Sequence, residues 1–467
     1  MLDESPRDAR LLRFWLVCGG VWLYSADTLV TATIAPAMVA DIGGVAFLNW
    51  TISVYEVGAI IAGATAAALC GRFGIKRVFL AATLLYAAGC LGAALAANMG
   101  EVLAGRLVQG LGGGMLLSLC YVATYAWYPQ SQWNRLFGIV AVIWGAGSLL
   151  GPLIGGAFAA HLWRGCFWLF AGQAVVLLAL AAHGLAADAT TARDPQRWPL
   201  RPLLILSAAT LLIAAAGLLA SPGLALLGCC AGTALLYGAA WLDRRAAQRL
   251  LPAQLLQLGH PLGAGLFMVF LLSLATTGFW TYGPLLLKVL FDTDPLVSGY
   301  LLAAEALAWS LATLAVGKLP ADQEVRLIRG GVCIIMVGAA GFAVAVPAGS
   351  LGGILACAIL QGAGFGLCWP SIAVRIVRCA DTAEQSLASA APSILQRIGY
   401  AVGAAAAGFA ANLSGLVDGA SAAAARSAAF WVFAGFLPVL ALALPCAWIF
   451  TASRRDDPGT HAPGATA

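Results

Sequence analysis

Two glycine-rich runs decide the fold: RLVQGLGGG at residues 106–114 and GAGSLLGPLIGG at residues 145–156. Both runs sit inside long apolar segments that are typical of lipid-buried helices. On a helix, Arg106, Gln109, Gly110 and Gly113 share one face, because they lie three or four residues apart. A charge and an amide face lipid only at a high cost, so we expect this face to meet a water-filled cavity or a protein neighbour.

The second run predicts a close helix contact. Gly147, Gly151 and Gly155 recur every four residues, which lets the backbone of another helix approach. Pro152 cannot donate a helical hydrogen bond, so we expect a bend in the middle of that face. Close glycine contacts occur in many membrane proteins, so the glycines alone leave the class of protein open.

Together the two runs resemble known motifs of one family. The Arg-x-x-Gln-Gly-x-Gly-Gly-Gly run resembles the fourth-helix motif of the major facilitator superfamily. The Gly-x-x-x-Gly-Pro-x-x-Gly-Gly run resembles the fifth-helix motif of the drug-exporting branches of that superfamily. The resemblance implies a helical transporter whose second motif separates exporters from importers.

Composition places the chain among polytopic membrane proteins. Of its 467 residues, 61% are hydrophobic and only 10% are charged, whereas a soluble protein carries about 25% charged residues. The first apolar run is too long for a cleavable signal, so none is expected. The 12 cysteines form no Cys-x-x-Cys pair and are interpreted as small apolar fillers. We therefore expect no metal, no cofactor and no nucleic acid partner.

Hydropathy predicts fourteen membrane-spanning helices. They cover residues 12–38, 47–70, 78–97, 101–127, 136–160, 166–187, 202–220, 223–242, 262–288, 296–317, 329–347, 351–376, 385–412 and 427–450. With both termini in the cytoplasm, 20 of the 25 Lys and Arg residues fall in cytoplasmic stretches, which satisfies the positive-inside rule. The expected location is the plasma membrane, the inner membrane of a bacterium.

An internal repeat divides the chain. QGLGGG at 109–114 is echoed by QGAGFG at 361–366, and a proline precedes Glu56 and Glu305 by 20 and 21 residues. The prediction is an all-α fold of two pseudo-symmetric six-helix bundles, 1–187 and 261–453, as inverted or parallel repeats are common in transporters. Residues 188–260 form a linker with an inserted two-helix hairpin, and 454–467 a disordered tail. This plan is similar to the fourteen-helix drug:proton antiporters.

Five ionisable residues fall well inside the predicted spans: Asp27, Glu56, Arg106, Glu305 and Arg397. A charge at the bilayer centre costs about 2.5–3.5 kcal/mol, so such residues usually face the interior of a bundle. The repeat places the two glutamates at equivalent positions, facing each other across a central cavity. There each could carry a proton or attract a cationic substrate. The alternative is a permanently protonated carboxyl bonded to a neighbouring helix.

The other two charges of the first half have family counterparts. Asp27, nine residues before Pro36, resembles the first-helix acid of the fourteen-helix antiporters. The alternative is an acid held in a structural network with residues on its own face. Arg106 resembles the fourth-helix arginine, which the family uses to tune a nearby acid. The alternative is a structural pair with Asp27 or Glu56.

Substrate recognition is expected around the same cavity. Tyr24, Gln109, Trp309, Gln361 and Arg397 are the candidate lining residues, since amides, a guanidinium and aromatic faces can bind polar or cationic ligands. Trp144 and Trp280 are further aromatic candidates. Tryptophans in membrane proteins also sit at interfaces or pack against neighbours, so no single one is decisive.

The loop after the second span carries a further resemblance. Arg72, Gly74, Lys76 and Arg77 fit the superfamily signature Gly-x-Leu-Ala-Asp-Arg-x-Gly-Arg-Lys, but Gly71 replaces its Asp. In the family that Asp helps to latch the cytoplasmic side, so this latch is in doubt here. The positive-inside rule alone would also produce a basic loop.

These features predict a proton-coupled exporter of lipophilic or cationic small molecules, working by alternating access as a monomer. Asp27, Glu56 and Glu305 would carry proton and substrate, and Arg106 would tune their proton affinity. The two six-helix bundles would rock against each other, supported by the helix face of Gly147, Gly151, Pro152 and Gly155. The alternatives are export of an endogenous metabolite or proton-coupled import of an organic solute by the same fold. An enzyme is not expected, because no nucleophile, metal cluster or His/Asp pair is visible.

Overall fold

The computed structural model describes residues 7–159, 162–185, 200–216, 218–219, 221–246, 249–316, 319–381, 384–416 and 422–452, which form helices and short connections without any strand. The helices are α1 (Arg7–Ile42), α2 (Trp50–Phe73), α3 (Ile75–Leu95), α4 (Met99–Trp127), α5 (Gln130–Ala159), α6 (Trp163–Gly184), α7 (Leu200–Ala216), α8 (Pro222–Arg245), α9 (Pro261–Phe291), α10 (Pro295–Val316), α11 (Glu324–Ala345), α12 (Leu351–Arg378), α13 (Gln385–Leu413), α14 (Ala422–Ala434) and α15 (Leu437–Ala452). Three 3₁₀ turns, Val45–Phe47, Ala253–Leu256 and Ala321–Gln323, lie between them. The expected tail 454–467 and most of the linker after α6 lie outside the described residues.

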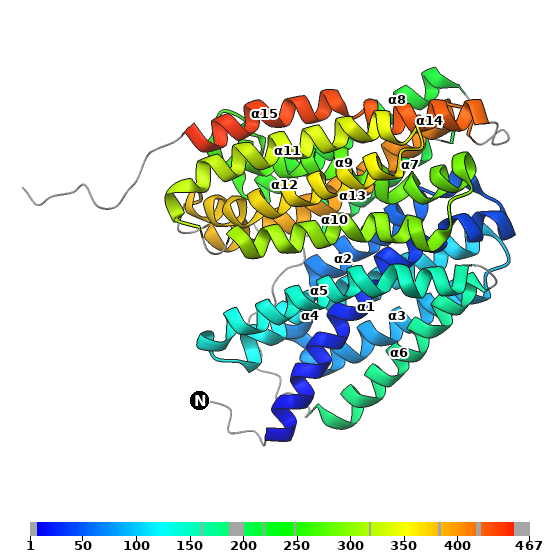
Figure 1. The fold of residues 1–467 in the computed structure, drawn as a ribbon. Coiled ribbons are helices and arrows are strands. Elements are labelled where there is room, and N and C mark those ends of the chain that lie inside the picture. Colours follow the sequence, from blue (N-terminus) through cyan, green and yellow to red (C-terminus); the bar gives the residue numbers. More distant parts are fainter. Residues whose placement is uncertain are drawn as a thin grey trace, which may run out of the picture.

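The helices form two halves with matching internal packing, α1–α6 and α9–α15 (Figure 1). In the first half α4 packs between α2 and α3, and in the second half α12 packs between α10 and α11. Likewise α1 packs on α5 and α9 packs on α13. This repetition is what two six-helix bundles of common origin would show, and it agrees with the all-α architecture predicted from the sequence.

Glycines let α4 lie this close to both neighbours. A Cβ at Gly110 would lie 2.2 Å from the carbonyl oxygen of Tyr55 on α2, and one at Gly112 would lie 2.3 Å from the backbone nitrogen of Tyr86 on α3. The α5 glycines act in the same way toward α1. A Cβ at Gly151 would lie 2.8 Å from the Leu29 side chain, so the close helix contact expected for that run is formed, and it is formed with α1.

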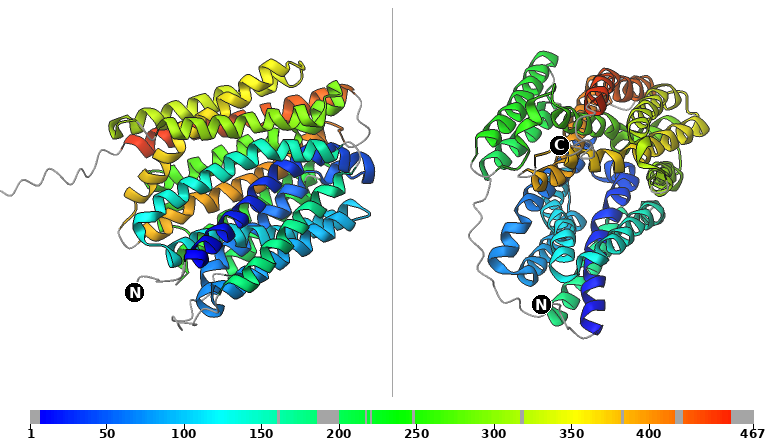
Figure 2. Two further views of the ribbon diagram at one scale, coloured as in Figure 1. Left: turned by 60° about the horizontal axis from the view of Figure 1, so that its bottom comes forward. Right: turned by 90° about the vertical axis from the view of Figure 1, so that its left-hand side faces the viewer.

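The two halves meet along two symmetry-related seams, α2 with α13 and α5 with α10. We call the end of the bundle where α1 begins and α15 ends the terminal end, and the end with the α1–α2 and α9–α10 loops the far end (Figures 1 and 2). Contacts across the seams reach the far end: the Ser53 hydroxyl donates to the Ala401 carbonyl at 3.0 Å, and Gly156 packs on Leu296. The halves separate toward the terminal end in Figure 1.

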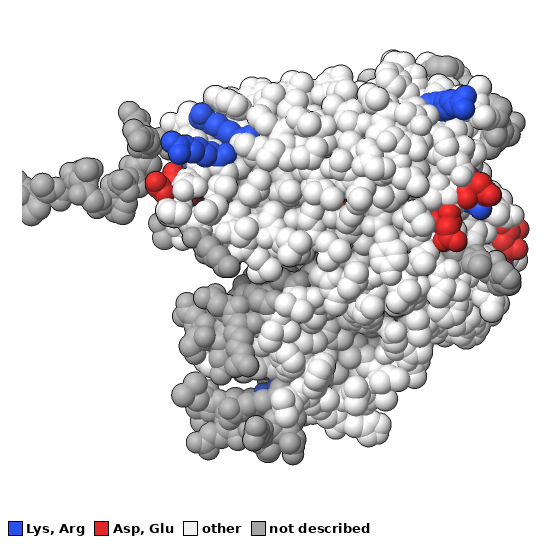
Figure 3. Space-filling view, viewed as in Figure 1, with Lys and Arg blue, Asp and Glu red and all other residues white. Residues whose placement is uncertain are grey.

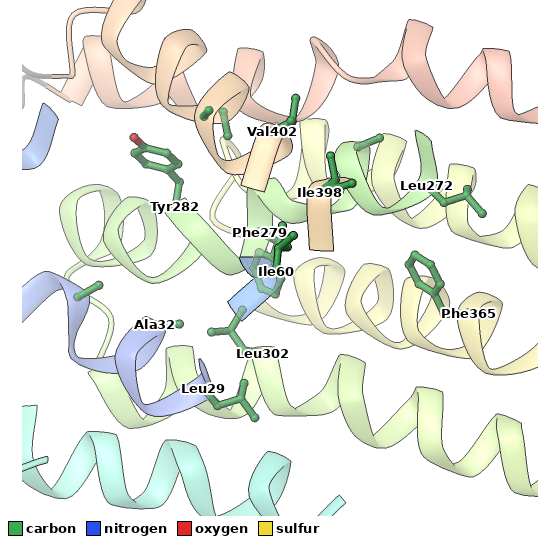
Figure 4. Packing of buried hydrophobic residues seen from close by; sticks show 14 of the residues in the cluster. Leu29, Ala32, Ile60, Leu272, Phe279, Tyr282, Leu302, Phe365, Ile398 and Val402 are labelled. Carbon is green, nitrogen blue, oxygen red and sulfur yellow. The ribbon is translucent and has the colours of Figure 1, made fainter. Parts of the chain in front are cut away.

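Apolar side chains from both halves join one buried cluster at the middle of these seams. Leu29 of α1 and Ile60 of α2 belong to it, as do Phe279 of α9 and Leu302 of α10 (Figure 4). The polar groups described below interrupt this cluster, so each of them has to find its hydrogen-bond partners inside the protein.

The hairpin of α7 and α8 lies between the two halves in sequence and against one seam in space. Its first helix, α7, packs on both α2 and α13. Its second helix, α8, packs mainly on α7. The hairpin therefore covers the α2–α13 seam.

Twelve segments among the described residues are long and apolar enough to cross a membrane. Two shorter apolar helices, Val142–Phe158 and Leu204–Ala216, lie at the fifth and seventh expected spans, so the count of fourteen crossings stays a prediction. The expected span 427–450 is matched by the apolar segment Ala422–Ala452, in which the helix is interrupted at Gly435 between α14 and α15. Pro438 lies in the first turn of α15, where a missing N–H is tolerated. The face in Figure 3 carries its charges at the two ends and almost none between.

Candidate functional site

The first buried acid, Asp27, is locked in a triad within the first half. Arg106 Nη1 donates to Asp27 Oδ2 at 2.6 Å and to Gln109 Oε1 at 2.8 Å. Gln109 Nε2 in turn donates to Asp27 Oδ1 at 2.8 Å. All three side chains are buried. The sequence left two partners open for Arg106, and the structure pairs it with Asp27.

Further contacts hold the Arg106 guanidinium in place. Its Nε donates to the Thr51 carbonyl at 3.3 Å, and its central carbon lies 4.1 Å from the centroid of the Tyr55 ring. The cation is thus paired with a carboxylate and also covered by an aromatic face, which stabilises a desolvated charge. Apart from its position beside Glu56, no sequence pattern singles out Tyr55.

The second acid, Glu56, is shared between the halves. The Tyr24 hydroxyl donates to Glu56 Oε1 at 3.2 Å. Arg397 of α13 lies with Nη1 3.2 Å from Glu56 Oε2 and also donates to the Tyr24 hydroxyl. The Arg397 guanidinium carbon lies 4.8 Å from the Tyr24 ring centroid. Arg397 and Tyr24, both expected in the cavity, therefore meet directly, and the ion pair joins the two halves.

The third acid, Glu305, has hydrogen-bond donors but no counterion. Trp280 Nε1 donates to Glu305 Oε2 at 2.8 Å, and Gln361 Nε2 donates to Glu305 Oε1 at 2.8 Å. The side chain is 3% exposed. No Lys or Arg of the described chain lies within ion-pair distance of this carboxylate. Sequence reasoning named Trp280 for stacking and missed its role as a donor to the acid.

The expected equivalence of Glu56 and Glu305 is wrong by one residue, as the contacts of Gly110 and Gly362 show. A Cβ at Gly110 would meet the Tyr55 carbonyl oxygen, whereas one at Gly362 would meet the Glu305 carbonyl oxygen at 1.9 Å. Tyr55, and not Glu56, is therefore the positional counterpart of Glu305. Both halves use an equivalent amide donor. Gln109, directly before Gly110, donates to Asp27 on α1. Gln361, directly before Gly362, donates to Glu305 on α10.

A small cavity lies between the two halves beside these groups. Glu56 and Arg106 line it from the first half, and Trp280 and Thr281 line it from the second. It has room for about one water molecule. Trp280, which lines this cavity, also donates to Glu305, so one side chain connects Glu305 to the cavity wall. The two glutamates are thus brought to one central region, though they do not contact each other.

The expected aromatic residues divide into two groups. Trp144 lies edge-on to Tyr24, with ring centroids 5.9 Å apart, beside the Glu56 group. Trp309 instead stacks on Phe365 of α12 at 4.7 Å, where it packs α10 against α12. Its position one turn after Glu305 explains why the sequence suggested a cavity role.

The basic loop after α2 contacts other residues of the first half. Lys76 donates to the Ala182 carbonyl at 2.9 Å and to the Leu185 carbonyl, which caps the end of α6 as a cation should. Gly74 has φ +81°, a conformation that favours glycine. Arg72 lies over the ring of Phe73, and Arg77 is exposed.

Comparison with known proteins identifies the family of this chain. The sequence profile of the Major Facilitator Superfamily matches residues 17–404. A "probable multidrug-efflux transporter" of Mycobacterium tuberculosis (strain CDC 1551 / Oshkosh) is 32% identical over 427 residues, 88% of this chain and 89% of the relative. The same is found for its counterpart in strain ATCC 25618 / H37Rv.

Solved structures share the fold at low sequence identity. A mutant of the nucleoside transporter NupG superposes with a TM-score of 0.69 at 13% identity, covering 94% of this chain and 100% of that one. A D-xylose-proton symporter superposes with a TM-score of 0.67 at 16% identity, covering 94% and 97%. With a family profile over most of its length and a relative matched almost end to end, this chain is a multi-pass membrane transporter and belongs to the Major Facilitator Superfamily.

Proposed function

We propose that the chain is a proton-coupled antiporter that exports lipophilic, cationic small molecules, with Glu305 as the proton-carrying group. The observation that supports this role is the difference in charge balance among the three central acids. Asp27 and Glu56 each have an arginine partner, whereas the partners of Glu305 within the described part of the chain are the neutral donors Trp280 and Gln361. A buried carboxylate without a counterion is costly, so taking up a proton relieves Glu305 more than the other two.

Charge balance also favours a cationic substrate. With Glu305 protonated, the two acid–arginine pairs leave the central region neutral. With Glu305 deprotonated, the region carries one net negative charge, which attracts a monocation. Exchange of one proton for one monocation then follows from the requirement that a desolvated site stay close to neutral. The mycobacterial relative is named a probable multidrug-efflux transporter, which is consistent with this substrate class.

The proposed setting is a bacterial inner membrane, with fourteen crossings, both termini in the cytoplasm and a monomeric transporter. The excess of Lys and Arg on the terminal side supports the orientation. In this orientation the seam contacts Ser53–Ala401 and Gly156–Leu296 close the outer side, and the halves separate toward the cytoplasm. Alternating access then requires the halves to rock about the α2–α13 and α5–α10 seams.

Proteoliposomes with an imposed pH gradient test the proposal, with ethidium as a monocationic dye. We expect the wild type to accumulate ethidium against its gradient as protons move the other way. Glu305→Gln should reduce gradient-driven transport to the level of protein-free liposomes while ethidium still binds, since the amide keeps the shape but carries no exchangeable charge. Glu101→Gln is the matched control, because Glu101 is exposed at the start of α4.

Two results contradict the proposal. If gradient-driven transport persists in Glu305→Gln, Glu305 is not the residue that carries the coupled proton. Accumulation of dye in the same direction as the protons would show symport in place of antiport.

A further inference from the structure

Tyr24 and Glu56 form a site with the features that bind organic cations. The Glu56 carboxylate accepts from the Tyr24 hydroxyl at 3.2 Å. The Tyr24 ring lies with its centroid 5.6 Å from that of Tyr55 and 5.9 Å from that of Trp144. A carboxylate beside several aromatic rings is the arrangement that attracts ammonium, guanidinium and flat aromatic cations.

This site already holds a cation, the guanidinium of Arg397. Arg397 makes both interactions that an organic cation would make. It is ion-paired to Glu56 at 3.2 Å, and its guanidinium carbon lies 4.8 Å from the Tyr24 ring centroid. It comes from α13, in the opposite half from Tyr24 and Glu56, so a residue of the second half occupies a recognition site of the first.

Arg397 is held less firmly than the other buried arginine. The Arg106 side chain is 2% exposed, pairs with Asp27 at 2.6 Å and has all its partners in its own half. The Arg397 side chain is 18% exposed and pairs with Glu56 at 3.2 Å across the seam. A partly exposed guanidinium can be hydrated when it is released, so displacing Arg397 costs less than displacing Arg106.

We propose that Arg397 is a tethered competitor, which occupies the cation site at Tyr24 and Glu56 and is displaced when a monocationic substrate binds there. This inference rests on the proposed function for its substrate class. Arg397 thereby sets specificity: a molecule enters the site only if its charge and aromatic surface replace both interactions of the guanidinium. The arginine also neutralises Glu56 when no substrate is bound.

Equilibrium binding of ethidium to the purified protein, followed by dye fluorescence at constant pH, tests this role. Removing the competitor in Arg397→Gln should tighten binding about tenfold or more, since one displaced charge-assisted contact corresponds to roughly that factor. Arg397→Lys should stay near the wild type, because the ammonium still competes for Glu56. The double variant Glu56→Gln with Arg397→Gln should lose the gain.

Unchanged or weaker binding in Arg397→Gln overturns the inference, because a purely structural arginine would give that result. A gain that survives in the double variant also overturns it, because the gain must come from the freed carboxylate. Thermal unfolding checks that each variant is folded. If Arg397→Gln does not fold, Tyr24→Phe removes the hydroxyl that Arg397 contacts and keeps the ring; tighter binding supports the inference and weaker binding overturns it.

The binding assay contains no pH gradient, so it separates this inference from the proposed function. A wild type that fails to transport ethidium in proteoliposomes contradicts proton-coupled export. If Arg397→Gln nevertheless binds the dye more tightly, the role of Arg397 as a tethered competitor is supported although proton-coupled export is not.

Discussion

Single residues differ here in how their buried charge is balanced, and this decides what each can do. Asp27 has a close counterion and two further donors, so its buried charge is compensated. Glu56 has a counterion that belongs to the other half. Glu305 has none among the described residues and keeps two neutral donors. A group whose charge is fully compensated serves structure, and a group whose charge is not compensated can change its protonation during transport.

Asp27→Asn should therefore act on stability first. It leaves the Arg106 cation buried without a counterion, which costs about 3–5 kcal/mol. The measurement is thermal and denaturant unfolding of the purified protein. Asp41→Asn is the matched control on the same helix, because the exposed Asp41–Arg164 pair should contribute only about 0–1 kcal/mol. Equal destabilisation by the two variants would contradict the fixed role of Asp27.

The sequence could identify these residues but not their partners. Five charges in apolar helices predict an interior site on cost alone, and all five are buried or nearly so. Helical periodicity places Arg106 and Gln109 on one face, and the structure agrees. The pairing of Glu56 with Arg397 spans 341 residues, and no local pattern encodes a contact between two helices that far apart.

Elements in this fold are spaced by glycines. At Gly362 an added Cβ would lie 1.9 Å from the Glu305 carbonyl oxygen, on the backbone of α10. Backbone cannot move aside as a side chain can, so α10 and α12 stay close only while this position is glycine. The same contact holds the backbone of Glu305 beside Gln361, whose amide donates to the Glu305 carboxylate.

Gly362→Ala should separate α10 from α12 and weaken both packing and transport. Overpacking of this kind costs about 1–3 kcal/mol, and the Gln361–Glu305 hydrogen bond should lengthen with it. The readouts are thermal stability and gradient-driven ethidium transport. Gly352→Ala on the same helix has no atom within 4 Å of the added Cβ and should leave both unchanged. Wild-type behaviour of Gly362→Ala would contradict the close approach.

At the level of elements, sequence reasoning was accurate for helix positions and less so for register. Each expected span has a helix at its place, because long apolar runs have no other stable form in lipid. Counting from the prolines aligns Glu56 with Glu305, and this alignment is wrong by one residue, because Tyr55 is the counterpart of Glu305. The interruption of the helix at Gly435 was not predicted, because one apolar segment runs through it from α14 into α15.

For the whole molecule, the far-end seam contacts predict which side must open. A Cβ built at Gly156 would lie 3.0 Å from Leu296 Cβ in the other half, close enough for a disulfide after a small adjustment. Oxidising the double variant Gly156→Cys with Leu296→Cys should stop transport, and a reductant should restore it. The single variants control for the 12 native cysteines. Full transport by the cross-linked protein would show that this end never opens.

The hairpin has a mechanical consequence for any such motion. α7 touches α2 of one half and α13 of the other, so it cannot move as a rigid body with both when they tilt apart. One of its two contacts has to slide. The buried side chains of α7 include the small Ala214 and the large Ile213, and Gly232 of α8 packs on Ile213, so α8 has to follow α7 in this motion. The hairpin therefore couples its own movement to the α2–α13 seam alone, because among the described helices neither α7 nor α8 packs on the α5–α10 seam.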